Sequence, residues 1–236
     1  MKHLILTITT LGLLFGTGLQ AQDKAGFYVG ARVFHADTDI DLNNSIVSQV
    51  NEGSLAIAAE DVSEDSKAPG VGLVYGYSFS EFHAIELQIS YFKAFESSAT
   101  VGITDGFNVL YLQGSSQLEA FPIMLSYLGS IPVHENFGFN IGAGAGALVS
   151  KFKGSGRASI DGVTSFPYSS SETEVTYAYQ AQVGAYYEIN KNLQINANFK
   201  YFKSGNLEFG DNNGSNNITD IKIDSKIIEA GIDYKF

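Results

Sequence analysis

Three acidic residues at alternate positions are the first candidates for chemistry in this chain of 236 residues. Asp37, Asp39 and Asp41 lie in the stretch DTDIDLNN, and carboxylate oxygens are ligands that hard divalent cations prefer. A calcium loop of the EF-hand type needs Gly at its sixth place and Glu at its twelfth, where this chain has Leu42 and Ser48. We therefore interpret the aspartates as an acidic, solvated rim and keep them only as weak candidates for a looser metal site.

A glycine-rich motif is the second candidate, because it could bind a nucleotide cofactor. Gly142, Gly144 and Ala147 match the pattern G-x-G-x-x-A, which in dinucleotide-binding proteins leads from a strand into a helix. Here the motif lies inside a run of alternating residues that continues to Val149. We expect small residues that leave room for bulky neighbours, and no cofactor.

Catalytic groups are the third possibility, and the sequence disfavours them. Apart from His3, the histidines are His35, His83 and His134, each in a different segment, so no Ser-His-acid group is apparent. The chain has no cysteine, which excludes a disulfide framework and a thiolate metal site. We do not expect an enzyme.

The N-terminus has the layout of a secretory signal peptide. A basic start at Lys2 is followed by an apolar run from Leu4 to Phe15 and by small and polar residues around Ala21. A membrane anchor is the alternative, but a spanning helix needs roughly 20 apolar residues and this run is shorter and interrupted. We predict a signal peptide over residues 1–21 and one mature domain over residues 22–236.

The formal net charge of −11 indicates which partners are unsuitable. Proteins that bind nucleic acid carry a basic patch that neutralises phosphates, and no such footprint is apparent in this sequence. We therefore exclude nucleic acid as a partner.

Alternation of apolar and polar residues dominates the rest of the chain. Successive side chains of a strand point to opposite faces, so each alternating run predicts a strand with one apolar face. Eight runs of this kind are present: 27–34, 71–79, 85–91, 121–128, 137–150, 175–189, 193–201 and 228–236.

Short and long connections between these runs alternate strictly. The four long ones are 41–68, 99–114, 154–172 and 208–221. In an up-and-down barrel every other connection lies at the same rim, and only a closed barrel satisfies all backbone groups of strands in lipid. We predict an all-β fold: an eight-stranded antiparallel up-and-down transmembrane β-barrel with four long extracellular loops and three short periplasmic turns. The alternative is a secreted soluble β-sandwich or a lipocalin-like binder.

The polar face of each run should line the lumen of this barrel. Eight strands leave an interior that side chains fill, so we expect a packed polar network, with a narrow ion gate as the alternative. Its predicted members are Arg32, Glu86, Glu188, Lys200, Glu229, Asp233 and Lys235. Aromatic residues at the short-turn ends of the runs should form an interfacial girdle, which includes Phe27, Phe79, Phe137 and Tyr187.

Three stretches carry a family resemblance: GFYVGARV, GFNIGAGAGALV and the terminal GIDYKF. With the signal peptide they make the chain resemble the small eight-stranded outer-membrane barrels, such as the OmpA transmembrane domain and the opacity proteins. The resemblance implies the outer membrane of a Gram-negative bacterium, with lipid and lipopolysaccharide as partners. It also implies that Tyr234 and Phe236 form a signal read by the barrel-assembly machinery.

The same resemblance leaves the activity open. A structural and surface-interaction role, in adhesion or envelope integrity, would act through the acidic loops and a host or cell-surface ligand. A small channel or carrier for ions or small apolar solutes is the alternative.

Overall fold

The computed structural model describes residues 25–42, 56–65, 67–104, 109–160, 164–209 and 219–236. The predicted signal peptide lies outside the described residues. Within them, no helix is long and apolar enough to cross a membrane. The described residues form ten strands: β1 (Gly26–Leu42), β2 (Ala56–Asp65), β3 (Lys67–Ser78), β4 (His83–Thr104), β5 (Val109–His134), β6 (Phe137–Ile160), β7 (Thr164–Glu188), β8 (Leu193–Ser204), β9 (Leu207–Phe209) and β10 (Thr219–Lys235).

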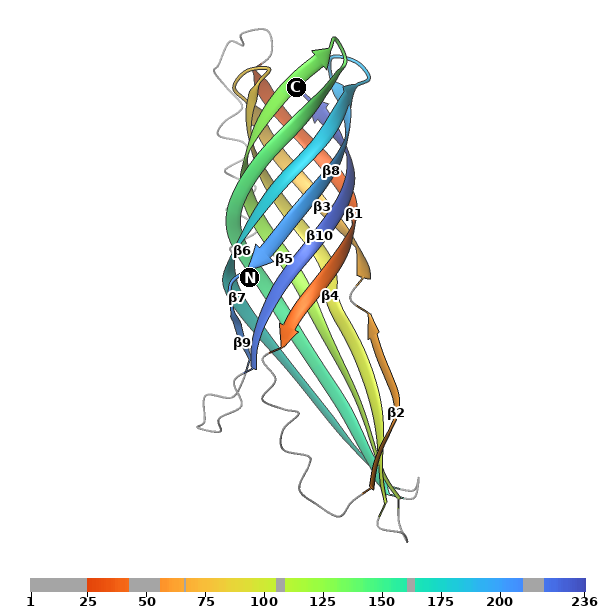
Figure 1. Cartoon of the computed structure of the whole chain (residues 1–236). Helices are drawn as coiled ribbons and strands as arrows, with labels where there is room; N and C mark the ends of the chain where they lie inside the picture. Colours follow the sequence, from red (N-terminus) through yellow and green to blue (C-terminus); the bar gives the residue numbers. More distant parts are fainter. Residues whose placement is uncertain (1–24, 43–55, 66, 105–108, 161–163, 210–218) are drawn as a thin grey trace.

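Eight of these strands close into an antiparallel barrel (Figure 1). The order around the ring is β1, β3, β4, β5, β6, β7, β8 and β10, and β10 pairs with β1 to complete it. The remaining two strands lie off the ring, since β2 pairs with β4 and β9 pairs with β10. The predicted eight-stranded barrel is confirmed.

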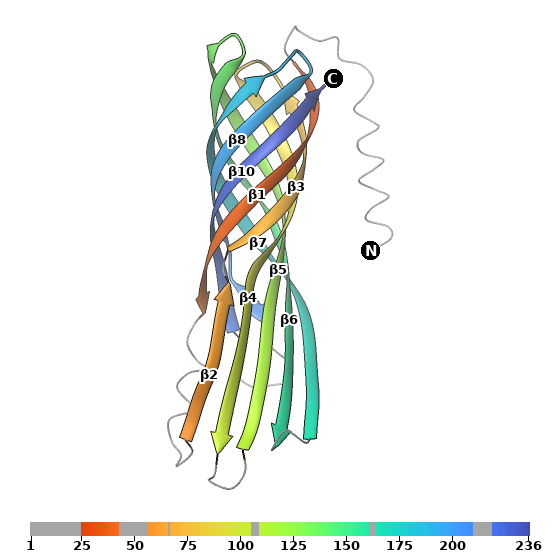
Figure 2. The ribbon, with the colours of Figure 1, turned by 90° about the vertical axis from the view of Figure 1, so that its right-hand side faces the viewer.

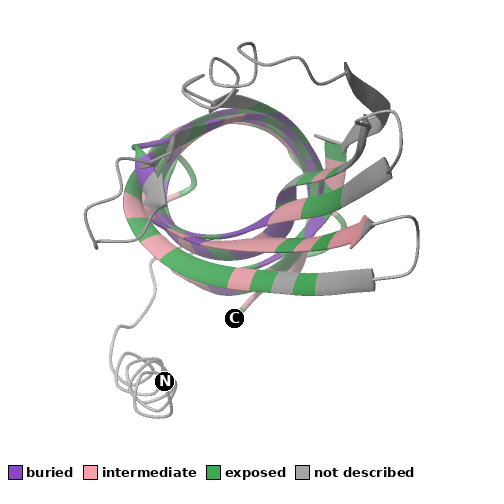
Figure 3. Cartoon of the chain, turned by 90° about the horizontal axis from the view of Figure 1, so that it is seen from below, coloured by how far each residue is buried: buried purple, intermediate pink, exposed green. Residues whose placement is uncertain are grey.

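Buried and exposed residues alternate along the strands of the barrel, which Figure 3 shows from below, coloured by burial. On β6 and β7 the outward Ile141 and Val183 are 60% and 52% exposed, whereas the inward Lys200 of β8 is 2% exposed. Apolar side chains on the outside of a closed barrel are stable in hydrocarbon and costly in water. This arrangement excludes the soluble sandwich, in which the same rows would form the core.

Four barrel strands continue well past the others on the side of the long connections (Figure 2). There β4, β5, β6 and β7 form a sheet that β2 extends at one edge. The stretch of β5 from Val109 to Glu119 alone is about 35 Å long at the usual rise per residue. We call the part formed by β2 and residues 96–104, 109–117, 153–160 and 164–171 the extension.

The extension corrects three of the expected loops, because β2 (Ala56–Asp65) lies within the predicted loop 41–68 and pairs with β4. The segments 99–114 and 154–172 are mainly paired strand, and only 105–108 and 161–163 lie outside the described residues. The stretches 96–98, 113–117 and 153–159 are rich in serine, glycine and charged residues and do not continue the apolar row of the barrel wall. The hydrophobic pattern therefore ends before the strands do.

Pro122 does not shift the register of the barrel wall, although the pairing of β5 with β4 skips it between Ile89↔Ile123 and Phe92↔Ala120. The register between β5 and β6 passes through it, with Phe121 opposite Val149 and Pro122 opposite Leu148. The register shifts lie elsewhere: one is between Lys93 and Phe95 of β4 in its pairing with β5, and the other is between Pro132 and His134 of β5 in its pairing with β6.

A charge placed on the outer face of the barrel should destabilise it strongly. We expect Ile141→Arg to reduce the free energy of unfolding by about 2 to 4 kcal/mol, because a cation near the bilayer midplane loses its hydration. The measurement is reversible urea unfolding in lipid vesicles. Ser155→Arg is the control, because Ser155 is exposed on the same face of the same strand beyond the apolar row, and we expect less than about 0.5 kcal/mol there. Equal losses for the two variants would contradict the placement of the apolar rows in lipid.

Candidate functional site

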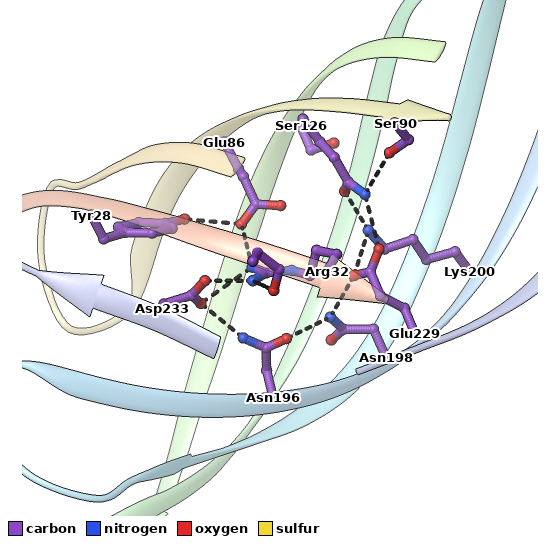
Figure 4. A network of polar contacts seen from close by, with 12 residues as sticks. Tyr28, Arg32, Glu86, Ser90, Ser126, Asn196, Asn198, Lys200, Glu229 and Asp233 are labelled. Atoms are coloured by element: carbon purple, nitrogen blue, oxygen red, sulfur yellow. Dashed lines mark hydrogen bonds and ion pairs between the residues drawn. The ribbon is translucent and has the colours of Figure 1, made fainter. Parts of the chain in front are cut away.

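A buried arginine is the centre of the polar network in the lumen (Figure 4). Arg32 of β1 donates two hydrogen bonds to Asp233 of β10, with Nη1 to Oδ1 at 2.5 Å and Nη2 to Oδ2 at 3.2 Å. Its Nη2 also lies 3.4 Å from Oε2 of Glu86 on β4, and its Nε lies 3.4 Å from Oε1 of Glu229 on β10. One guanidinium therefore connects three carboxylates from two sides of the barrel.

A buried lysine forms the second positive centre. Nζ of Lys200 lies 2.8 Å from Oε1 of Glu229 and donates to Oε1 of Gln88 at 2.5 Å. Nε2 of Gln88 in turn donates to Oε2 of Glu229 at 2.9 Å. The network thus holds three carboxylates and two cations, and each charge has a partner, as burial in a medium of low dielectric requires.

Uncharged side chains donate further hydrogen bonds to the carboxylates, while Nε of Arg32 and Oδ1 of Asn198 are buried without a hydrogen-bond partner among the described residues. Tyr28 donates to Glu86 at 3.2 Å, Asn196 donates to Asp233 at 2.8 Å, and Asn198 donates to Glu229 at 3.2 Å. Sequence reasoning did not name these residues as members. The available signal was their inward position in the same alternating rows as the charged residues.

Glycine next to Arg32 makes the central contact possible. Gly231 lies opposite Arg32 in the register of β1 and β10. A Cβ atom added at Gly231 would lie 2.5 Å from Cδ of Arg32, which is too close for a real contact. The absence of a side chain therefore gives the guanidinium its place.

The lumen beyond the network, toward the extension, is apolar. Phe92, Phe202, Leu118 and Leu148 are each at most 1% exposed, and Phe34 meets Phe92 edge to face with ring centroids 5.9 Å apart. We call this cluster the apolar plug; it consists of Phe34, Ala36, Phe92, Ala94, Leu118, Ala120, Met124, Leu148, Ala178, Phe202, Leu207, Ile223 and Ile227. The sequence analysis predicted a polar lumen throughout and missed it.

A small cavity lies between the network and the apolar plug. Its lining includes Gln88, Lys200 and Glu229 from the network, together with Phe92 and Phe202 from the plug. The volume of about 20 Å³ suffices for about one water molecule. The lumen is therefore a packed interior at this level.

Two predicted members of the network lie apart from it. Lys235 and Glu188 pair with each other at 2.6 Å near the short-turn rim, where their side chains are 33% and 35% exposed. Both alternate onto the inward face, as expected, but the lumen opens to solvent at their depth. They form an isolated, partly solvated ion pair.

The predicted girdle residues lie near the short-turn rim. Phe27 stacks on Tyr75 with centroids 5.7 Å apart, and Phe79 meets Tyr77 at 5.2 Å. The other members of this surface are Phe137, which meets Phe139 at 5.2 Å, Tyr187, which is 47% exposed, and Tyr234, which meets Phe236 at 5.3 Å.

The candidates for metal binding and catalysis are not brought together. Asp37 and Asp39 are exposed on β1, and Asp39 lies 3.9 Å from Lys226, whereas the side chain of Asp41 is outside the described set. Among the described residues, no three metal-ligating side chains form a group.

The candidates for catalysis and for nucleotide binding also remain apart from any such group. Nδ1 of His83 forms a hydrogen bond with the hydroxyl of Tyr127 at 2.6 Å, and not with a serine or a carboxylate. The glycine motif lies within β6 and leads into no helix.

A sequence model of the outer membrane protein beta-barrel domain matches residues 7–236. The chain belongs to the outer membrane β-barrel family. This outer membrane β-barrel is thus assigned to the outer membrane of Gram-negative bacteria. A search of curated proteins gave no significant match.

Several solved structures resemble this outer membrane β-barrel. Neisserial surface protein A is 15% identical, with 89% of this chain and 97% of that chain covered and a TM-score of 0.49. The attachment invasion locus protein Ail of Yersinia pestis is 16% identical, with 89% and 99% covered and a TM-score of 0.44. OprG from Pseudomonas aeruginosa is 16% identical, with 90% and 97% covered and a TM-score of 0.42. At this identity and similarity we transfer no function from them.

Proposed function

We propose that this outer membrane β-barrel has a structural and surface-interaction role, in adhesion or envelope integrity. The observation that carries the proposal is the extension, a sheet on the extracellular side whose side chains at Gln113, Ser115, Arg157 and Ser169 are exposed. Binding residues generally lie on segments that a rigid scaffold presents to solvent. The barrel is the anchor, and the extension is the surface presented to a host or cell-surface ligand.

The test removes the parts of the extension that continue β4, β5, β6 and β7, and it keeps the barrel and β2. Residues 97–116 and 154–170 are each replaced by Asn-Gly, which joins Glu96 to Gln117 and Lys153 to Ser171, two pairs already opposite in register. The heat-dependent shift in electrophoretic mobility should remain, which shows that the barrel still closes. Adherence of cells to matrix or to each other, or resistance of the envelope to detergent, should fall to the level of a deletion strain.

The control for this test is the variant Lys191→Gln in the short turn between β7 and β8, which keeps both strand pairs at full length. It should behave as the wild type in mobility and in envelope resistance. If the variant without the extension adheres and resists detergent like the wild type, the proposed role is wrong.

A channel or carrier is the second candidate, and the packed lumen disfavours it. A continuous path would need room beside Arg32 and through the apolar plug, where Phe92 and Phe202 are at most 1% exposed. Planar-bilayer recordings of the purified protein should show no discrete conductance. Reproducible conductance steps would favour the channel.

We also propose partners for assembly and for the membrane. Tyr234 and Phe236 are 49% and 74% exposed, which supports the proposal that they form a signal for the barrel-assembly machinery. The outward rows imply contact with outer-membrane lipid and lipopolysaccharide. The signal peptide over residues 1–21 provides export.

A further inference from the structure

Strand β7 has no neighbouring strand on one side where it leaves the barrel, at the edge of the extension opposite β2 (Figure 2). Its pairing with β8 ends at Ala178 and Ser204, and the last bond on this side runs from the N–H of Gly205 to the carbonyl of Tyr177. Beyond that point β9 pairs with β10 and not with β7. Residues 169–175 of β7 therefore pair with β6 alone among the described strands, and we call them the free edge.

The register shows which backbone groups the free edge presents. In an antiparallel sheet the N–H and C=O groups of one residue point to the same neighbour, and the direction alternates along the strand. The carbonyl of Tyr177 points away from β6, because Gly205 donates to it, and the register of β6 with β7 has no shift. Ser169, Ser171 and Thr173 therefore direct their N–H and C=O groups away from β6, and all three residues are exposed.

A proline limits the free edge at its outer end. Pro167 lies two residues before Ser169, so the N–H group that it lacks would also point away from β6. Its place opposite Arg157 therefore costs no hydrogen bond of the ladder with β6. Proline blocks an edge strand against further pairing, so the part of β7 that is open to pairing begins at Ser169.

The other edge of the extension is protected. Strand β2 forms that edge, and four of its 10 residues, AIAAEDVSED, are acidic. Its register with β4 also shifts between Ala59 and Asp61. Charges and bulges protect an edge strand from pairing with another chain. The free edge has no shift and carries only Glu172 and Glu174 as charged residues, so a further strand fits there and not at β2.

The two carboxylates of the free edge determine which strand fits. Glu172 and Glu174 alternate onto the same face as the buried Ala178. Neither forms an ion pair with a residue whose side chain the structure describes. The cations of β6 at this level, Lys151 and Lys153, are in register with odd-numbered residues of β7 and thus belong to the opposite face. Opposite charges directly across a strand pair attract, so an added strand needs basic residues at two alternate positions.

We propose that the free edge binds an extended, basic segment of another protein as an additional antiparallel strand. The backbone groups of Ser169, Ser171 and Thr173 form the ladder, which supplies affinity, and the side chains supply specificity. Glu172 and Glu174 pair with two lysine or arginine side chains that are separated by one uncharged residue. The net charge of −11 adds a long-range attraction for such a segment. The inference deepens the proposed function and rests on it, because it names the kind of partner that this extracellular surface takes.

The experiment measures the affinity of the full-length protein in detergent micelles for a fluorescent heptapeptide that alternates threonine and lysine. When its lysines lie opposite the two glutamates, the N–H groups of its threonines point to β7 and those of its lysines point to solvent. Three further peptides are compared with it: one with glutamate in place of lysine, one methylated at the threonine nitrogens and one methylated at the lysine nitrogens. We expect the first two to bind about tenfold more weakly and the third to bind like the parent peptide.

Variants of the protein test the same contacts from the other side. E172Q with E174Q removes both charges, and since each cross-strand pair of opposite charge is worth up to about fivefold, the lysine peptide should bind about tenfold more weakly. S171P removes one N–H group of the free edge without removing a bond to β6, and should weaken binding by about fivefold. E135Q in the short turn between β5 and β6, at the opposite rim, is the control and should change nothing. If S171P loses the heat-dependent mobility shift, the peptide methylated at its threonines tests the ladder instead.

Three results would overturn the inference. Equal affinity for the lysine and glutamate peptides, or wild-type affinity in the double glutamine variant, would mean that the carboxylates select nothing. Equal affinity after methylation of the threonines would mean that the peptide is attracted by charge alone and adds no strand. The adherence of cells without the extension is a separate measurement. If that adherence is lost although the peptide does not bind, another surface of the extension acts; if the peptide binds although adherence does not depend on the extension, the free edge binds a strand without the broader role.

Discussion

Replacement of Arg32 by methionine is expected to lower the free energy of unfolding of the barrel by about 3 to 5 kcal/mol, because removal of one partner leaves buried charge uncompensated. Arg32 is 3% exposed and touches Asp233, Glu86 and Glu229. Without it, Lys200 is the only cation left in the network formed by these carboxylates. Methionine fills much of the volume of arginine, so the decrease in the free energy of unfolding reflects mainly the missing charge and less the packing. The measurement is urea unfolding in lipid vesicles at neutral pH.

Two further variants separate this effect from a general loss of ion pairs. Lys235→Met removes a cation from the pair with Glu188, which is about one third exposed, and should cost less than about 1 kcal/mol. Adding Asp233→Asn to the Arg32 variant should recover part of the lost stability, since one carboxylate no longer needs a partner. A loss below 1 kcal/mol for the Arg32 variant itself would mean that water reaches the network and replaces the guanidinium.

Truncation of Phe202 is expected to have an effect of similar size. Phe202 is 1% exposed in the apolar plug and borders the cavity beside Lys200. Phe202→Ala should lower the free energy of unfolding by about 3 to 5 kcal/mol, because apolar contacts are lost and the cavity grows within a closed wall that cannot collapse onto it. The same unfolding measurement tests it.

The matched control for this prediction is Phe202→Leu. Leucine keeps most of the apolar volume, so we expect a loss below about 1.5 kcal/mol. If the alanine and leucine variants are equally stable, the apolar plug does not support the barrel at this position.

The barrel wall could be predicted from the sequence because lipid imposes a strict pattern on it. Along β6 every second residue from Phe137 to Val149 faces outward, and each of these is apolar. The inward position of Arg32 and Lys200 follows from the same alternation. These predictions need only the alternation of residues within one strand, and a single sequence contains that information.

Contacts between strands distant in sequence could not be predicted in this way. Asp233 meets Arg32 across 201 positions of the chain, and only the register of β10 against β1 brings them together. The sequence also did not show that Glu188 and Lys235 lie near the solvent and outside the buried network, because this depends on where β7 and β10 end. The extension was missed because its strands have solvent on at least one face, so alternation no longer distinguishes strand from loop.

Closure between β1 and β10 also constrains the order of events during biogenesis. The N–H of Phe236 donates to the carbonyl of Phe27 at 3.0 Å, so the first and last strands meet at the seam of the ring. Until the last strand has crossed the inner membrane, β1 has one edge without a partner, and such an edge is prone to pair with another chain. Contacts between the two ends of a chain form slowly because the entropy of closing the long loop must be overcome first. The seam therefore makes the interval before β10 pairs with β1 the stage at which the chain exposes an unpaired strand edge.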